Sequence, residues 1–152
     1  MKTEPDEEWI NKIKEYLWEK FSIKTGNIDV YDEAFTHSTC GTPNNQRLAF
    51  LGDRVFDLLF ADDILEKHPD DVVGALDRKR IGIHDKKPQT RMARKIGLIG
   101  PMVFGKAYEN TPKEELENHE TIMSEALEAL LGAIYHDQGL EKAREIVQDL
   151  VR

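Results

Sequence analysis

The chain has 152 residues, a length that fits one domain of ordinary size. Its single cysteine, Cys40, excludes a disulfide framework and a cysteine-rich zinc site, so we expect a reducing, cytoplasmic compartment. Charges interrupt every apolar stretch before the roughly 20 residues that a membrane span requires, and we expect no membrane partner. The net charge of −8 argues against nucleic-acid binding through a generally basic surface. It does not exclude an enzyme that meets phosphates through bound cations, because such sites are built from carboxylates.

Apolar residues recur at helical spacing along nearly the whole chain, which predicts an all-α fold of seven or eight helices. The first amphipathic helix covers about Trp9–Phe21, and a short helix is expected over Val30–His37. A turn-rich loop over 41–45 leads into a long helix, which begins near Leu48 and should end at Pro69.

The second half of the chain continues the helical pattern. Asp70 and Asp71 can cap the next helix, and Pro88 can open the one after it. The expected helices cover 72–83, 88–97, 119–136 and 140–151, with a loop over 97–111. Neither strands nor internal repeats are expected, and residues 1–152 are interpreted as a single domain.

Three carboxylates form the candidate chemical site. Glu125 and Glu128 are three residues apart, so on a helix they lie on one face, one turn apart, beside an apolar stripe. Desolvated carboxylates need a partner, and Asp53 on a facing helix could complete a divalent-cation site. Mg²⁺ suits such a set because it takes one or two carboxylates and keeps several waters. The alternative is an acidic pair that simply faces water, as is common in a chain with 33% charged residues.

Two glycines interrupt the helical segments that carry these carboxylates. A glycine inside a helix costs about 1 kcal/mol relative to alanine, so Gly52 and Gly132 are expected to serve close packing. A crossing of the two helices at these glycines would bring Asp53 near Glu128.

The segments around these residues resemble the signatures of the ribonuclease III family. Arg47–Asp53 is similar to Asn-Glu-Arg-Leu-Glu-Phe-Leu-Gly-Asp, which opens the family's catalytic helix, and Glu128–Tyr135 is similar to a second signature. Further likenesses follow in the family's order, over about residues 10–150, at Ala34–Ser38, Arg91–Leu98 and Phe104–Lys106. The resemblance implies a ribonuclease III-type helical endonuclease domain.

The same resemblance implies a homodimer that cleaves double-stranded RNA with Mg²⁺, for which Mn²⁺ could substitute, in RNA processing. Asp53 and Glu128 match catalytic metal ligands, and Glu125 stands where the family commonly has aspartate. Phe50 matches a residue that inserts into the partner subunit.

Two positions depart from the family's pattern. Gln46 and Ala49 replace residues that are usually acidic, and Ala49 removes a carboxylate from the helical face of Asp53. The small Mini-III branch is similar in carrying alanine here, and it has no separate duplex-binding domain, as we expect of this chain; its members are nevertheless enzymes. The sequence therefore favours a metal-dependent endoribonuclease. The alternative is a catalytically inactive ribonuclease III-like dimer that binds structured RNA or a protein partner.

Cations concentrate in the middle of the chain and are candidates for RNA contacts. RNA duplexes are recognised by A-form shape, phosphates and 2′-hydroxyls, which suits exposed basic side chains. The candidates are Arg78, Lys79, Arg80, Lys86, Lys87, Arg91, Arg94 and Lys95. The alternative is a solvated helix face. His37 is expected to be a hydrogen-bonded structural histidine rather than a general base, because no acid or nucleophile lies near it in the sequence.

Overall fold

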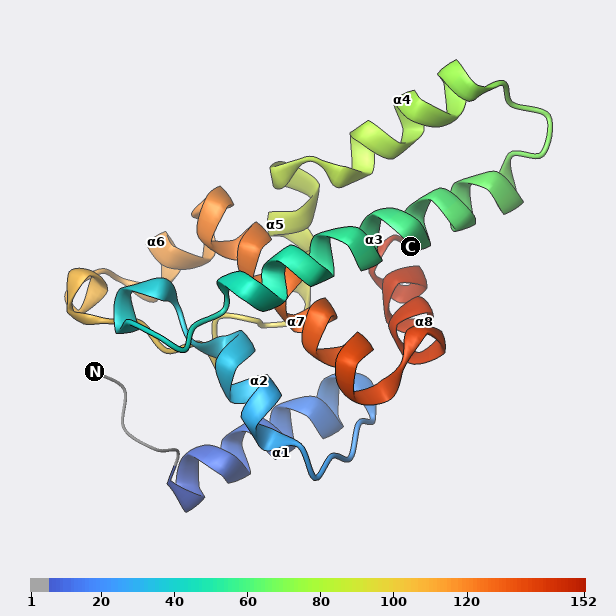
Figure 1. The fold of residues 1–152 in the computed structure, drawn as a ribbon. Coiled ribbons are helices and arrows are strands. Elements are labelled where there is room, and N and C mark those ends of the chain that lie inside the picture. Colours follow the sequence, from blue (N-terminus) through green and yellow to red (C-terminus); the bar gives the residue numbers. More distant parts are fainter. Residues whose placement is uncertain (1–5) are drawn as a thin grey trace.

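The computed structural model describes residues 6–152, so the first five residues of the predicted domain lie outside this range. Eight α-helices form the described part of the chain (Figure 1). They are α1 (Glu7–Phe21), α2 (Ile28–Phe35), α3 (Gln46–Lys67), α4 (Val73–His84), α5 (Lys86–Lys95), α6 (Lys113–Glu117), α7 (Glu120–Gln138) and α8 (Leu140–Leu150), with short 3-10 helices at Ser38–Cys40 and Lys106–Tyr108. Residues 6–152 contain no β-strand, only a parallel bridge between Thr36 and Val103. The predicted all-α fold is confirmed.

Helix α7 is the centre of the fold. It contacts α2, α3, α5, α6 and α8, and Figure 1 shows it crossing beneath α3. Eleven of its 19 residues are buried, which leaves few positions on this helix for polar side chains. Glu125 and Glu128 are two of those positions, and both are half-buried.

The crossing of α3 and α7 is made backbone to backbone, as the two glycines predicted. A Cβ atom on Gly52 would lie 1.6 Å from the carbonyl oxygen of Glu128. A Cβ atom on Gly132 would lie 2.3 Å from the carbonyl oxygen of Leu48. Neither position can accept a side chain without moving a helix, because the opposing atoms belong to the backbone. The crossing therefore fixes Asp53, the residue after Gly52, next to the carboxylate-bearing face of α7.

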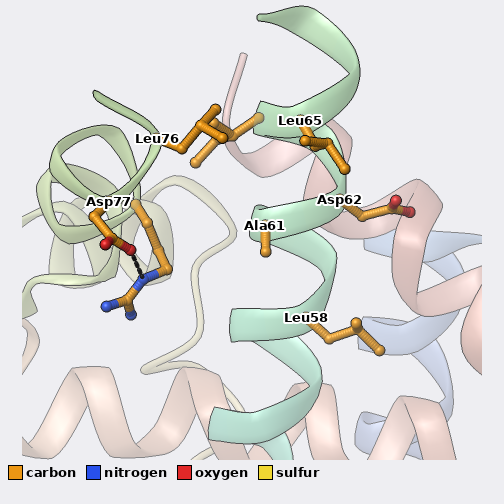
Figure 2. A pocket seen from close by; sticks show the side chains of 8 residues that line it. Leu58, Ala61, Asp62, Leu65, Leu76 and Asp77 are labelled. Atoms are coloured by element: carbon orange, nitrogen blue, oxygen red, sulfur yellow. Dashed lines mark ion pairs between the residues drawn. The ribbon is translucent and has the colours of Figure 1, made fainter. Parts of the chain in front are cut away.

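The C-terminal part of α3 and helix α4 form an arm that extends away from the rest of the molecule (Figure 1). Every residue of α4 is at least partly exposed. The two helices are joined by an ion pair between Arg80 Nη1 and Asp57 Oδ1 at 3.0 Å. Between them lies a mostly apolar groove of about 330 Å³ (Figure 2). The arm thus presents an apolar surface that residues 6–152 leave open.

Some helix boundaries differ from the sequence-based expectation. Asp71 does not cap α4: Val72 holds the N-cap position, and the Asp71 carboxylate pairs with Lys79. Helix α5 begins before Pro88 because Asp85 Oδ1 accepts a hydrogen bond from the Lys86 amide at 2.8 Å and caps it.

The chain also leaves α2 earlier than expected. The helix ends at Phe35, because Thr36 turns into an extended conformation and pairs with Val103. The predicted loop over 97–111 includes a short 3-10 helix, and α6 follows it without having been predicted. In the part of the chain that the structure describes, no helix combines the length and apolar character needed to cross a membrane.

Candidate active site

Asp53 lies on α3 at the edge of the helix crossing, with its side chain 34% exposed. Its Oδ2 accepts a hydrogen bond from Arg54 Nη1 at 3.1 Å. Its Oδ1 lies 3.1 Å from Nε2 of His84, the last residue of α4. The Arg54 guanidinium also stacks on the Phe50 ring, 3.9 Å from the ring centroid. Both carboxylate oxygens of Asp53 are therefore in contact with nitrogen atoms of this chain.

Glu128 faces Asp53 from α7 in a partly desolvated position. Burial, followed by the negative charges of Asp53 and Glu125, raises the pKa of Glu128 to about 7. The positive charges of Arg54 and Lys86 oppose this shift without cancelling it. The three carboxylates predicted from the sequence therefore form one electrostatically coupled group at the crossing, with more negative charge than the nearby cations neutralise.

Oxygen donors and unbalanced negative charge fit a hard divalent cation. Within residues 6–152, no three acidic, histidine or cysteine side chains are already close enough to hold a metal ion together. This arrangement still fits Mg²⁺, which binds through one or two carboxylates and fills its shell with water and substrate phosphate. Asp53 and Glu128 are the residues best placed to act as those carboxylates.

The two departures from the family's pattern lie on the same helix. Gln46 is the first residue of α3 and is exposed, so it contributes no charge to the site. Ala49, one turn before Asp53, is only 7% exposed and packs in the core. The position that would carry another carboxylate is thus filled by a methyl group, which lowers the negative charge available to a cation.

The basic residues proposed for RNA contacts lie on two helices, α5 and α4. Lys86 belongs to the site: its Nζ donates a hydrogen bond to Thr121 Oγ1 at 3.1 Å, and its charge acts on Glu128. The other α5 cations are solvent-exposed, on a helix that packs beside α7; they are Lys87, Arg91, Arg94 and Lys95. On α4, by contrast, Lys79 and Arg80 form ion pairs with aspartates, and Arg78 is exposed.

His37 has the structural role that the sequence favoured. Its ring is packed against Phe104, with the centroids 5.2 Å apart, and its Nδ1 lies 2.8 Å from Thr39 Oγ1. The Thr39 hydroxyl oxygen also accepts a hydrogen bond from the Gly105 amide at 2.8 Å. Burial, followed by the charge of His119, lowers the pKa of His37. His37 therefore links the loop before α6 to the 3-10 helix Ser38–Cys40.

The sequence did not reveal two neighbours of Asp53. Arg54 could have been suspected, because it is adjacent in sequence and also lies one turn after Phe50. His84 gave no such signal, since it lies 31 residues away and reaches Asp53 only through the turn between α3 and α4.

Comparisons with known proteins identify the family that this chain resembles. A family model described as Ribonuclease-III-like matches residues 27–152. The Ribonuclease 3 of Pelagibacter ubique is 33% identical over 141 residues, covering 92% of this chain and 61% of that protein. The Ribonuclease 3 of Dechloromonas aromatica is 36% identical over 121 residues, covering 80% of this chain and 53% of that protein.

A solved structure is also similar along most of its length. The nuclease domain of ribonuclease III from Campylobacter jejuni superposes with a TM-score of 0.82 at 30% identity, covering 90% of this chain and 94% of that domain. That structure is described as showing flexibility in a region involved in dimer formation. This chain spans little more than half the length of the curated relatives, and the matched part has the nuclease-domain fold. The chain belongs to the ribonuclease III-like family.

Proposed function

We propose that this chain is a metal-dependent endoribonuclease domain that hydrolyses the phosphodiesters of double-stranded RNA with Mg²⁺, in cytoplasmic RNA processing. The observation that carries the proposal is the glycine-mediated crossing of α3 and α7, which gathers Asp53, Glu125 and Glu128 at one place. Membership of the ribonuclease III-like family supports the same conclusion.

The side chains would divide the work as follows. Asp53 and Glu128 would hold the cation, and Glu125 would add negative charge one turn away on α7. A bound Mg²⁺, or Mn²⁺ in its place, supplies an activated water and stabilises charge that develops on the phosphate. Glu128 must be ionised to bind a cation, and burial beside two other carboxylates, which raises its pKa, makes that charge costly until a cation compensates it. Lys86 would meet a phosphate beside the site.

A second copy of the chain is the proposed partner on the α3–α4 arm. Phe50 is 65% exposed and Leu58 and Leu65 are 56% and 59% exposed, all on one side of α3. The groove between α3 and α4 continues this surface through apolar side chains such as Leu76 (Figure 2). Exposed apolar surface of this extent is typical of an interface. A homodimer would provide two sites, one for each strand of a duplex.

The exposed cations of α5 suit the RNA backbone. Their helix packs beside α7, so a duplex that reaches the carboxylates would pass near them. A side chain such as Arg91 offers charge to phosphates without reading bases, which matches recognition of A-form shape.

One observation favours a second function. Gln46 and Ala49 leave the site with fewer carboxylates than the family's pattern, which would suit a catalytically inactive dimer that binds structured RNA or a protein. The retained group of Asp53, Glu125 and Glu128 weighs against that alternative, because an unused site has no reason to keep the cost of clustered charge.

Cleavage assays on three proteins separate the two functions. The parent chain, Asp53→Asn and Ala49→Glu are incubated with a short labelled RNA duplex in Mg²⁺, Mn²⁺ or EDTA. The enzyme proposal expects metal-dependent cleavage by the parent, none by Asp53→Asn, and equal or greater cleavage by Ala49→Glu. Duplex binding without cleavage by either the parent or Ala49→Glu would instead establish the inactive dimer.

A further inference from the structure

His84 occupies a defined position beside Asp53. It is the last residue of α4, and its carbonyl oxygen accepts a hydrogen bond from Nε2 of the buried Gln89 at 3.2 Å. Its ring lies against Phe56, with the ring centroids 6.4 Å apart. Phe56 and Asp53 are three residues apart on α3, so one imidazole covers both side chains.

The two ring nitrogens of His84 have different surroundings. Nε2 lies 3.1 Å from Asp53 Oδ1. Nδ1 is buried and has no hydrogen-bond partner among residues 6–152. A buried N–H without an acceptor is costly, whereas a bare ring nitrogen forgoes only a weaker acceptor role. The surroundings therefore favour the tautomer in which the hydrogen is on Nε2, facing the carboxylate.

We propose that His84 is a positioning residue for the nuclease site: its Nε2–H holds Oδ1 of Asp53, so that the carboxylate is oriented before a divalent cation binds. The inference rests on the proposed function and adds His84 to the three carboxylates of the site. Groups that orient a metal ligand contribute strongly to metal affinity, because an ordered ligand loses less freedom on binding. Such support matters here because Ala49 leaves the site one carboxylate short.

A purely structural role makes a different prediction. If His84 only packs against Phe56, an apolar side chain of similar size should preserve the metal affinity. If His84 acts through its Nε2–H, only a side chain that keeps an N–H donor should preserve the metal affinity. His84→Leu keeps the packing and removes the donor, whereas His84→Gln keeps a donor amide. The exposed His136 provides a matched control, since His136→Leu removes an imidazole far along α7.

The test is a calorimetric titration of each protein with Mg²⁺ and with Mn²⁺, without RNA. The parent and His136→Leu should bind with equal affinity, and His84→Gln should keep most of that affinity. His84→Leu should bind about 10- to 100-fold more weakly, the loss typical when a ligand-orienting partner is removed. Thermal unfolding of the metal-free proteins checks that each variant is folded. Cleavage of an RNA duplex should show the same order.

The outcomes distinguish failure of this inference from failure of the proposed function. Metal binding by the parent with undiminished affinity in His84→Leu would overturn the role of His84 and leave the nuclease proposal standing. Equal losses in His84→Leu and His84→Gln would also overturn it, because the donor would then make no difference. A parent chain that binds neither metal would overturn both, since Asp53 would have no cation to receive.

Discussion

Replacing Glu128 with glutamine should stabilise the metal-free protein at alkaline pH. In the fold the pKa of this carboxyl is raised from 4.5 to about 7, so the folded protein holds a proton that the unfolded chain has released. The stability associated with this proton is fully present below pH 4.5 and is lost as the pH rises through 7. A shift of this size corresponds to at most about 3 kcal/mol. Because the side chain is partly exposed, screening reduces the expected effect to about 1–2 kcal/mol.

Urea unfolding in EDTA measures this difference directly. Glu128→Gln should exceed the parent in free energy of unfolding by that amount at pH 8, and the gain should vanish near pH 4. Glu66→Gln removes an exposed carboxylate from α3 and serves as the control, with no comparable gain. Mg²⁺ should then stabilise the parent but not Glu128→Gln. A Glu128→Gln protein that is equally stable or less stable than the parent at pH 8 would refute the claim that uncompensated charge gathers at this site.

Three further predictions concern the crossing, the dimer and RNA binding. Gly52→Ala should lower the free energy of unfolding by about 3 kcal/mol or more, because the added Cβ would meet the carbonyl oxygen of Glu128. Gly26→Ala is the control, since a Cβ there meets open space, and similar urea midpoints for the two variants would contradict the crossing. Phe50→Ala should weaken self-association in sedimentation experiments without lowering the stability of the monomer, because the ring is 65% exposed. An unchanged association constant would exclude Phe50 from the interface. Lys86→Gln should weaken duplex binding and reduce, by about one, the slope of the logarithm of the binding constant against the logarithm of the salt concentration. An unchanged slope would exclude Lys86 from the phosphate contacts.

The sequence predicted the features that depend on local pattern. Helices repeat their apolar residues at regular spacing, and a glycine inside such a pattern signals a close approach, so the crossing at Gly52 and Gly132 could be anticipated. The all-α fold followed from the same signals. The neighbours of a carboxylate along its own helix can be deduced because positions three and four apart share a face.

Features set by the path of the chain between helices could not be read in this way. Asp71 has the chemistry of a helix cap, but its carboxylate pairs with Lys79 of α4 instead of capping that helix. His84 reaches Asp53 only because α4 returns along α3 after the turn that joins them. The exposure of α4 could not be predicted either, because its sequence does not indicate whether another surface will cover it.

The most direct test is the initial rate at which the parent chain cleaves a labelled RNA duplex as Mg²⁺ is titrated, with Asp53→Asn measured in parallel. The account predicts a rate that rises with Mg²⁺ to saturation, is abolished by EDTA and is absent in Asp53→Asn. Cleavage that persists in EDTA or in Asp53→Asn, or a parent chain that leaves the duplex intact at every Mg²⁺ concentration, would contradict it.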